Sequence, residues 1–158
     1  MAEKEADIPG VVAPPVLIYL VPMGAGFCLD FFLIPLSTGL PGLLLSIVGA
    51  VLILLALVLI FPALFDFRRA GTDSRPWKET SAIVATGPYR ITRNPMYLGF
   101  TLIMLAAGLM LDTLWILMLL PPVLLVMRQG VILREERYLE HKFGQAYLDY
   151  KSRVRRWL

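Results

Sequence analysis

The sequence predicts an all-α integral membrane protein, with about four transmembrane helices and a C-terminal amphipathic helix at the membrane interface. Two bulk properties predict this class: 58% of the 158 residues are hydrophobic, and the mean hydropathy is +0.70. A soluble domain contains about 45–50% apolar residues. The third observation is the distribution of charge, because the basic residues gather at the ends of long apolar stretches.

Four apolar stretches are candidate spans, since about 20 helical residues cross the hydrocarbon core. The first contains Asp30, which we place near the interface because turn residues follow it closely. The second carries no charge before Asp66, and its Gly42, Ser46 and Gly49 recur at helical spacing, which predicts a close helix contact. The predicted spans are 16–36, 40–65, 96–111 and 114–133.

The C-terminal stretch 134–158 has apolar and aromatic residues at near-helical spacing with basic residues between them. This pattern predicts an amphipathic helix on the membrane surface, bent at Gly144. The loop 66–93 carries six arginine and lysine residues, so the positive-inside rule places it, and both termini, in the cytoplasm. A short chain without a recognisable targeting signal favours the bacterial inner membrane.

The length predicts a single domain over residues 1–158, with a two-span part at 1–65 and a catalytic part at 66–158. The single cysteine, Cys28, allows no intrachain disulfide, and the single histidine, His141, completes no metal-binding pattern. The net charge is +3, and the basic residues lie at the ends of the apolar segments. This distribution indicates contacts with lipid headgroups and not with nucleic acid.

A polar, basic stretch, 86–99, separates the second and third spans and is the first candidate site. Gly87-Pro88 predicts a turn, and Asn94-Pro95 predicts a helix start with Asn94 as N-cap and Pro95 at the first helical position. A helix N-terminus leaves backbone N–H groups free and carries partial positive charge. Such a stretch at a membrane face is suited to hold a polar cofactor beside a lipid.

The second candidate site is the acidic pair Glu135-Glu136, directly after the fourth span. Two carboxylates at a membrane exit require partners. Arginines such as Arg93 and Arg134, or the ammonium of a bound cofactor, fit that need. Each signal also has a plain structural interpretation: the glutamates as a solvated helix face, the arginines as positive-inside residues, and the tyrosines as interfacial aromatics.

Several motifs occur together in a fixed order. They are Ile83-Val84-Ala85-Thr86-Gly87-Pro88-Tyr89, Arg93-Asn94-Pro95-Met96-Tyr97-Leu98-Gly99, Glu135-Glu136 and Phe143-Gly144-Gln145-Ala146-Tyr147. This series, over about half of the chain, resembles the isoprenylcysteine carboxyl methyltransferase family, which is related to the membrane phospholipid methyltransferases.

The resemblance implies a helical membrane enzyme that uses S-adenosylmethionine without a Rossmann domain, with the cofactor entering from the cytosol and the lipid from the bilayer. The tyrosine rings would face the adenine or the sulfonium, and Glu135 would pair with the cofactor ammonium. Arg93 and Glu136 are the candidate catalytic residues; for an amine acceptor, Glu136 is the nearest candidate base, with His141 behind it. The implied cofactor-binding residues are Ser81, Ala82, Ile83, Val84, Tyr89, Asn94, Pro95, Met96, Tyr97 and Glu135.

The chain departs from the family pattern at two positions. Asn94 stands where many members have a histidine, which excludes an imidazole-dependent role. Val131 stands where those members have a substrate-contacting arginine, and Arg128 and Arg134, each about one turn away, are the candidate replacements. The acceptor is therefore left open between an isoprenylcysteine carboxylate and a phospholipid amine.

Two other function classes remain open from the sequence. A non-enzymatic membrane bundle, such as a transporter subunit or assembly factor, explains the spans but not the motif series on one membrane face. An NADPH-dependent reductase of related architecture would need a site for a larger dinucleotide. The sequence leaves the oligomeric state undetermined.

Overall fold

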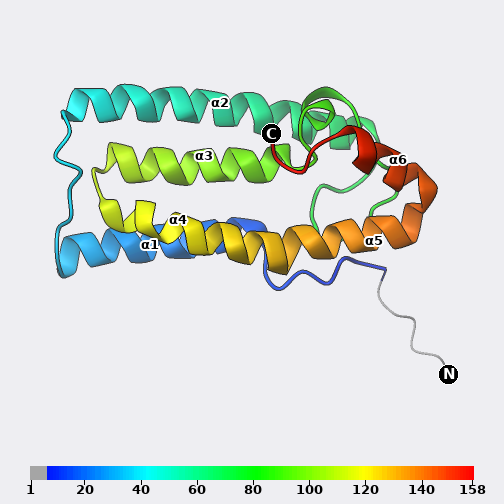
Figure 1. Ribbon diagram of the computed structural model, residues 1–158, viewed down its shortest axis with the longest axis horizontal. Coiled ribbons are helices and arrows are strands. Elements are labelled where there is room, and N and C mark those ends of the chain that lie inside the picture. Colours follow the sequence, from blue (N-terminus) through cyan, green and yellow to red (C-terminus); the bar gives the residue numbers. More distant parts are fainter. Residues whose placement is uncertain (1–6) are drawn as a thin grey trace.

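The computed structural model describes residues 7–158, and its long helices lie side by side along one axis (Figure 1). One end of this bundle carries α6, from which the C-terminal segment runs back to the start of α3. The elements are α1 (Pro15–Phe32), α2 (Gly42–Arg69), η1 (Gly87–Arg90), α3 (Pro95–Met110), α4 (Leu114–Met127), the π-helix η2 (Arg128–Ile132), α5 (Leu133–Phe143) and α6 (Gln145–Arg153).

Within residues 7–158, three helical stretches are long and apolar enough to cross a membrane: α1, α2 and the continuous stretch Leu114–Phe143. The fourth, α3, is apolar but has only 16 residues. Large apolar side chains on the outer faces are exposed, among them Phe31 at 70% and Leu43 at 76%. Side chains of this kind match lipid tails. The predicted helical membrane bundle is confirmed.

Helix α3 lies between α2 on one side and the pair α1 and α4 on the other (Figure 1). Small residues allow the approach of α2: a Cβ added at Gly49 would lie 2.2 Å from Met110 Cγ, and one at Gly99 would lie 2.5 Å from Ile60 Cγ1. Gly42, by contrast, faces open space. The close contact predicted for the second span therefore forms at Gly49.

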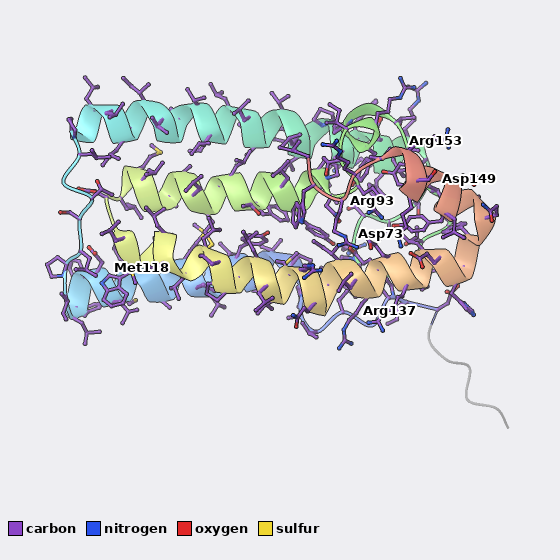
Figure 2. All side chains as sticks on the ribbon, in the orientation of Figure 1. Asp73, Arg93, Met118, Arg137, Asp149 and Arg153 are labelled. Atoms are coloured by element: carbon purple, nitrogen blue, oxygen red, sulfur yellow. The ribbon has the colours of Figure 1, made fainter. Side chains whose placement is uncertain are left out.

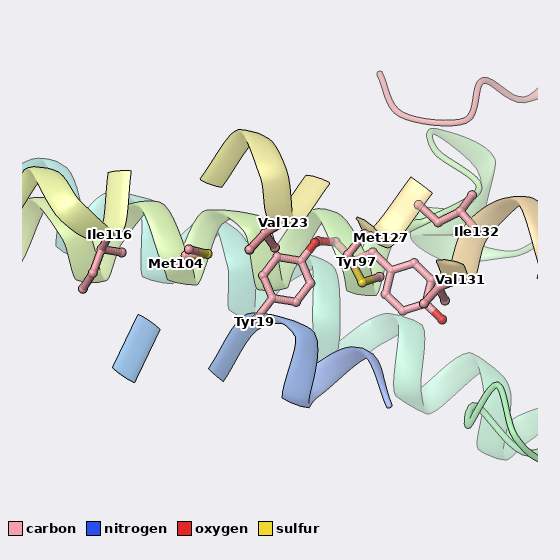
Figure 3. Packing of buried hydrophobic residues seen from close by; sticks show 8 residues of the cluster. All are labelled: Tyr19, Tyr97, Met104, Ile116, Val123, Met127, Val131 and Ile132. Atoms are coloured by element: carbon pink, nitrogen blue, oxygen red, sulfur yellow. The ribbon is translucent and has the colours of Figure 1, made fainter. Parts of the chain in front are cut away.

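The buried cluster that joins the helices runs along α3 and α4 and reaches the candidate site (Figure 3). Ile116 lies at one end of this row of side chains, and Tyr97, Val131 and Ile132 lie toward the other end. The hydroxyl of Tyr19 pairs with Thr101 Oγ1 at 2.9 Å, which ties α1 to α3.

The loops at the opposite end of the bundle are held by two aspartates. Asp30 accepts the backbone N–H of Leu36 at 2.9 Å, and Asp112 accepts the N–H and the hydroxyl of Thr38 at 2.8 and 2.6 Å. Asp30 thus pairs with a backbone N–H of the loop that follows α1. Its place near the membrane interface stays a prediction.

The C-terminal part differs from the predicted helix 134–158 in where that helix begins. Helix α5 continues α4 without a break, because no proline or turn residue separates Pro122 from Phe143 and Gly130 is absorbed in the π-helix. The chain turns at Gly144, where φ is +54°, and α6 then folds back toward α3 (Figure 1). The predicted bend is confirmed.

Candidate functional site

The acidic pair is oriented by the π-helix between α4 and α5. A π-turn carries one more residue than an α-turn, so it rotates the side chains that follow it, and such turns are frequent at functional sites. The N-terminal segment packs on this turn: Val12 N donates to Gly130 O at 3.1 Å, and a Cβ at Gly130 would lie 2.5 Å from Val12 Cγ2. Only glycine fits under this segment.

Glu136 lies at the centre of a buried ionic cluster and is 5% exposed. Its Oε1 lies 3.0 Å from Arg93 Nη1. Arg156 binds both carboxylate oxygens, from Nε to Oε1 at 2.9 Å and from Nη2 to Oε2 at 2.7 Å. Sequence reasoning predicted the pair of Arg93 and Glu136 but missed Arg156, which lies among four basic residues near the C-terminus.

The C-terminal segment is fastened to the start of α3 through its backbone. Arg93 N donates to Arg155 O at 2.9 Å, and Arg156 O accepts Thr92 Oγ1 at 3.0 Å and Asn94 Nδ2 at 2.9 Å. Helix α3 begins at Pro95 with Asn94 in the N-cap position, as predicted. The Asn94 side chain makes no capping hydrogen bond, however, because its amide is used to hold the tail.

Glu135 points to a different partner, the hydroxyl of Tyr97, which donates to Oε1 at 2.8 Å. Neighbouring residues on α5 therefore contact two successive parts of α3: Glu136 reaches the turn before the helix, and Glu135 reaches its first turn. The structure thus brings the acidic pair onto the Asn-Pro helix start.

Tyrosines surround this region, and burial keeps them protonated. Tyr150 donates its hydroxyl to Tyr89 O at 2.9 Å, and Phe67 packs edge-on against the Tyr89 ring with centroids 5.5 Å apart. Burial raises the pKa of Tyr147 to about 12, and the nearby Glu136 charge acts in the same direction. Burial also raises the pKa values of Tyr89 and Tyr150 above their ordinary range.

These groups line a cavity of about 790 Å³, a volume that includes its solvent-open part. Charged side chains gather at this end of the bundle, whereas Met118 marks the apolar end (Figure 2). The predicted site residues that line the cavity are Ala82, Ile83, Val84, Tyr89, Arg93, Asn94, Met96, Tyr97, Glu135 and Glu136.

Four predicted residues lie outside the lining of this cavity. Ser81 instead holds the preceding loop, with its N–H on Thr72 Oγ1 at 2.9 Å and its hydroxyl on Gly71 O at 3.3 Å. Pro95 is packed at the start of α3. The two substrate-binding candidates lie at different places: Arg134 donates to Gly10 O at 2.8 Å, and Arg128 lines a second pocket.

Sequence reasoning missed several residues that line the cavity. The sequence places Tyr147 and Tyr150 on an amphipathic face, and Tyr147 also in the motif series, but neither was predicted as a site residue. No sequence pattern marked the lining residues of the loop 73–80, because the position of this loop depends on tertiary contacts. Missed lining residues are Pro9, Phe67, Asp73, Ser74, Arg75, Pro76, Thr80, Ile132, Tyr138, Leu139, Tyr147 and Tyr150.

The loop that covers the cavity is attached to α5 by one lysine. Lys142 Nζ lies 2.9 Å from Glu79 Oε1, 2.5 Å from Asp7 Oδ2 and 3.1 Å from the Tyr138 hydroxyl. Tyr138 in turn accepts the N–H of Thr80 at 3.3 Å. The N-terminal segment and the loop 73–80 thus meet on α5 beside the cavity.

The second pocket is an apolar groove between α3 and α4. Trp157 and Leu158, which directly follow Arg156, line it, and Arg128 has the one charged side chain among its described lining residues. Leu98, which follows Tyr97 of the first cavity, lines this groove, so the two spaces lie on neighbouring faces of α3. The lining residues are Leu98, Thr101, Pro121, Leu124, Leu125, Arg128, Trp157 and Leu158.

Comparison with known proteins identifies the family. The family model described as "Phospholipid methyltransferase" matches residues 44–146, which include the cavity's α3 and α5 residues. A protein of Haemophilus influenzae described as "Uncharacterized protein" is 48% identical over 65 residues, 40% of this chain and all of that protein. No solved structure matches. The chain therefore belongs to the phospholipid methyltransferase family, and is by that membership a membrane methyltransferase.

Proposed function

We propose that this protein transfers a methyl group from S-adenosylmethionine to a lipid-like acceptor at the cytoplasmic face of the membrane. The observation that carries the proposal is the joining of two distant motifs at one cavity: Glu135 to Tyr97 at 2.8 Å, and Glu136 to Arg93 at 3.0 Å. A family model for phospholipid methyltransferases covers both motifs, which supports this chemistry over transport or assembly.

The lining of the cavity fits the chemical parts of the proposed donor. Aromatic rings of Phe67, Tyr89 and Tyr147 offer faces for adenine and for a sulfonium cation. Glu135 supplies a negative charge for the ammonium group. When bound, S-adenosylmethionine supplies a methyl group already activated by the sulfonium. We propose that Ala82, Ile83 and Val84 form the apolar wall beside the nucleoside.

The acceptor chain is proposed to occupy the apolar groove between α3 and α4. Its lining is almost entirely apolar, which suits an acyl or prenyl chain, and Arg128 is placed to meet an anionic headgroup. Arg134 is the weaker of the two substrate-binding candidates, because its guanidinium already donates to Gly10 O. The acceptor itself is either a phospholipid amine or an isoprenylcysteine carboxylate.

The main contribution of this chain's residues to the reaction is to align the methyl donor with the acceptor. Holding two reactants in a reactive geometry can supply on the order of 7–11 kcal/mol. A carboxylate acceptor arrives ionised, whereas an amine must first lose a proton. Glu136 remains the proposed base for an amine, but both of its oxygens are engaged by arginines, so it must release one partner to accept a proton. This requirement favours an acceptor that needs no base.

The polar end of the bundle is proposed to face the cytoplasm. The segment 66–93, from the last turn of α2 to the start of α3, carries six basic residues, and the connections at the opposite end carry none. The bacterial inner membrane is the proposed location.

The test is a ligand and product assay on the purified protein in lipid nanodiscs. S-adenosylhomocysteine should raise the unfolding temperature, and NADPH should not. Labelled S-adenosylmethionine should then transfer its methyl group into a total lipid extract, from which the labelled species is identified. Stabilisation by NADPH alone would favour a reductase, and no response to either ligand with no labelled lipid would reject the enzyme.

A further inference from the structure

Two segments without helix or strand form one wall of the polar cavity. We call residues 7–10 the strap and residues 73–80 the flap. Asp73 of the flap lines the same cavity as Arg93, at the charged end of the bundle (Figure 2). The lining residues from these two segments are Pro9, Asp73, Ser74, Arg75, Pro76 and Thr80.

The flap is joined at its base and organised by its own contacts. At the base, Ser81 N donates to Thr72 Oγ1 at 2.9 Å, which brings the two ends of the flap together. Within it, Asp73 Oδ1 accepts the backbone N–H of Arg75 at 2.9 Å, and the Arg75 guanidinium binds both carboxylate oxygens at 2.8 and 2.5 Å. A surface loop whose ends meet and whose side chains pack on one another can move as a unit.

Each segment has a glycine at the point where it joins the anchored part of the chain. Gly71, before the flap, has a φ of +65°, and Gly10, at the end of the strap, has a φ of +63°. A Cβ at either position would meet no described atom within 4 Å, so neither glycine is required by packing. After Gly10 the chain is held, because Val12 N donates to Gly130 O at 3.1 Å. Glycine tolerates large changes in φ and ψ, which suits both positions to act as hinges.

Two side chains one turn apart on α5 hold the strap and the flap together. Lys142 Nζ lies 2.9 Å from Glu79 Oε1 of the flap and 2.5 Å from Asp7 Oδ2 of the strap. The Tyr138 hydroxyl donates to Asp7 O at 3.1 Å and accepts the N–H of Thr80 at 3.3 Å. The free side of both segments is therefore fastened at one place.

This fastening is weaker than the contacts on the opposite side of the cavity. The side chains of Asp7 and Glu79 are 52% and 65% exposed, and exposed ion pairs contribute little to stability because water competes for the same groups. Glu136, by contrast, is buried between Arg93 and Arg156. The strap and the flap should therefore open while the ionic cluster stays in place.

We propose that the strap and the flap form a lid over the cavity, that Lys142 is the latch of this lid, and that the cofactor is exchanged when the latch opens. This inference rests on the proposed function, because it concerns the route of S-adenosylmethionine and its product. Lys142 acts as a positioning residue, since it lies outside the described lining of the cavity.

The experiment measures ligand release and opening of the flap separately, on the full chain in nanodiscs. Release is the dissociation rate of labelled S-adenosylhomocysteine in excess unlabelled ligand. Opening is the amide hydrogen exchange of the peptide 73–81, which contains the Thr80 and Ser81 donors. The test variant is Lys142→Met. The matched control is Lys151→Met, because Lys151 pairs with Glu140 at similar exposure and lies outside the described lining of the cavity.

Lys142→Met should speed release by about threefold to tenfold, as expected for loss of two exposed ion pairs, and exchange of the flap should rise by a similar factor. Glu79→Gln frees the flap alone and should give part of this effect. Lys142→Arg should stay within about twofold of the wild type, and Lys151→Met should change neither rate. Bound S-adenosylhomocysteine should slow exchange of the flap in the wild type.

Faster exchange of the flap with an unchanged release rate would overturn the proposal, because the flap would then lie outside the exit route. No change in either rate for Lys142→Met would remove the latch, and an equal acceleration in Lys151→Met would assign the effect to general loosening of α5 and α6. If the wild type binds no S-adenosylhomocysteine, the proposed function fails and this inference fails with it. If it binds and its release does not depend on Lys142, only this inference fails.

Discussion

Removing the Glu136 carboxylate should be among the most destabilising single changes in this protein. Glu136→Gln leaves Arg93, with 9% of its side chain exposed, without the only ion-pair partner it has among residues 7–158. Arg156 loses a bidentate partner but is 28% exposed and can turn toward water. Breaking a buried ion pair by removing one partner costs about 3–5 kcal/mol. Because one of the two arginines can be rehydrated, we expect the lower end, about 3 kcal/mol.

The assay is SDS-induced unfolding of the protein from mixed micelles, followed by circular dichroism. The control is Asp73→Asn, which removes an exposed pair with Arg75 and should leave the transition unchanged. The double variant Arg93→Leu with Glu136→Leu should be more stable than Glu136→Gln, because no unpaired buried charge remains at these two positions. A loss below about 0.5 kcal/mol for Glu136→Gln, the range of an ordinary surface substitution, would refute the buried-pair reasoning.

The other predictions concern the phenol contacts and the helix contact. Tyr97→Phe removes the hydroxyl that holds Glu135 at 2.8 Å and should weaken S-adenosylhomocysteine about tenfold by calorimetry; an unchanged affinity would remove this contact from the cofactor site. The folded state keeps Tyr147 protonated, with a pKa of about 12, while the unfolded chain ionises near pH 10, so roughly 2–3 kcal/mol of stability should be lost as the pH rises from 10 to 12. Unfolding titrations across this range should show a shallower decline for Tyr147→Phe, and an equal slope would contradict the assignment. Gly99→Ala should destabilise by about 1–3 kcal/mol in SDS titrations, because its Cβ would lie 2.5 Å from a side chain and 3.2 Å from a backbone oxygen of α2. Gly24→Ala, with open space around it, should be neutral or stabilising, and similar losses for both would argue against this contact.

The elements that follow from local physics were predictable from the sequence. Apolar length predicted the bundle of helices, Asn94-Pro95 predicted the start of α3, and Gly144 predicted the turn before α6. Each of these depends on residues within one or two helical turns. The polar stretch and the acidic pair were also recognisable as the places where a site would form.

Only the tertiary structure decided how those parts meet. Glu136 pairs with Arg156, 20 residues away, in addition to Arg93, and the Asn94 amide holds a carbonyl 62 residues away in place of capping its own helix. Arg128 and Arg134 look equivalent in the sequence, yet one lines the groove and the other binds the N-terminal segment. Periodicity and turn chemistry act over a few residues. The choice among several equally charged partners depends instead on which backbone segments pack together, and that packing is a property of the whole chain.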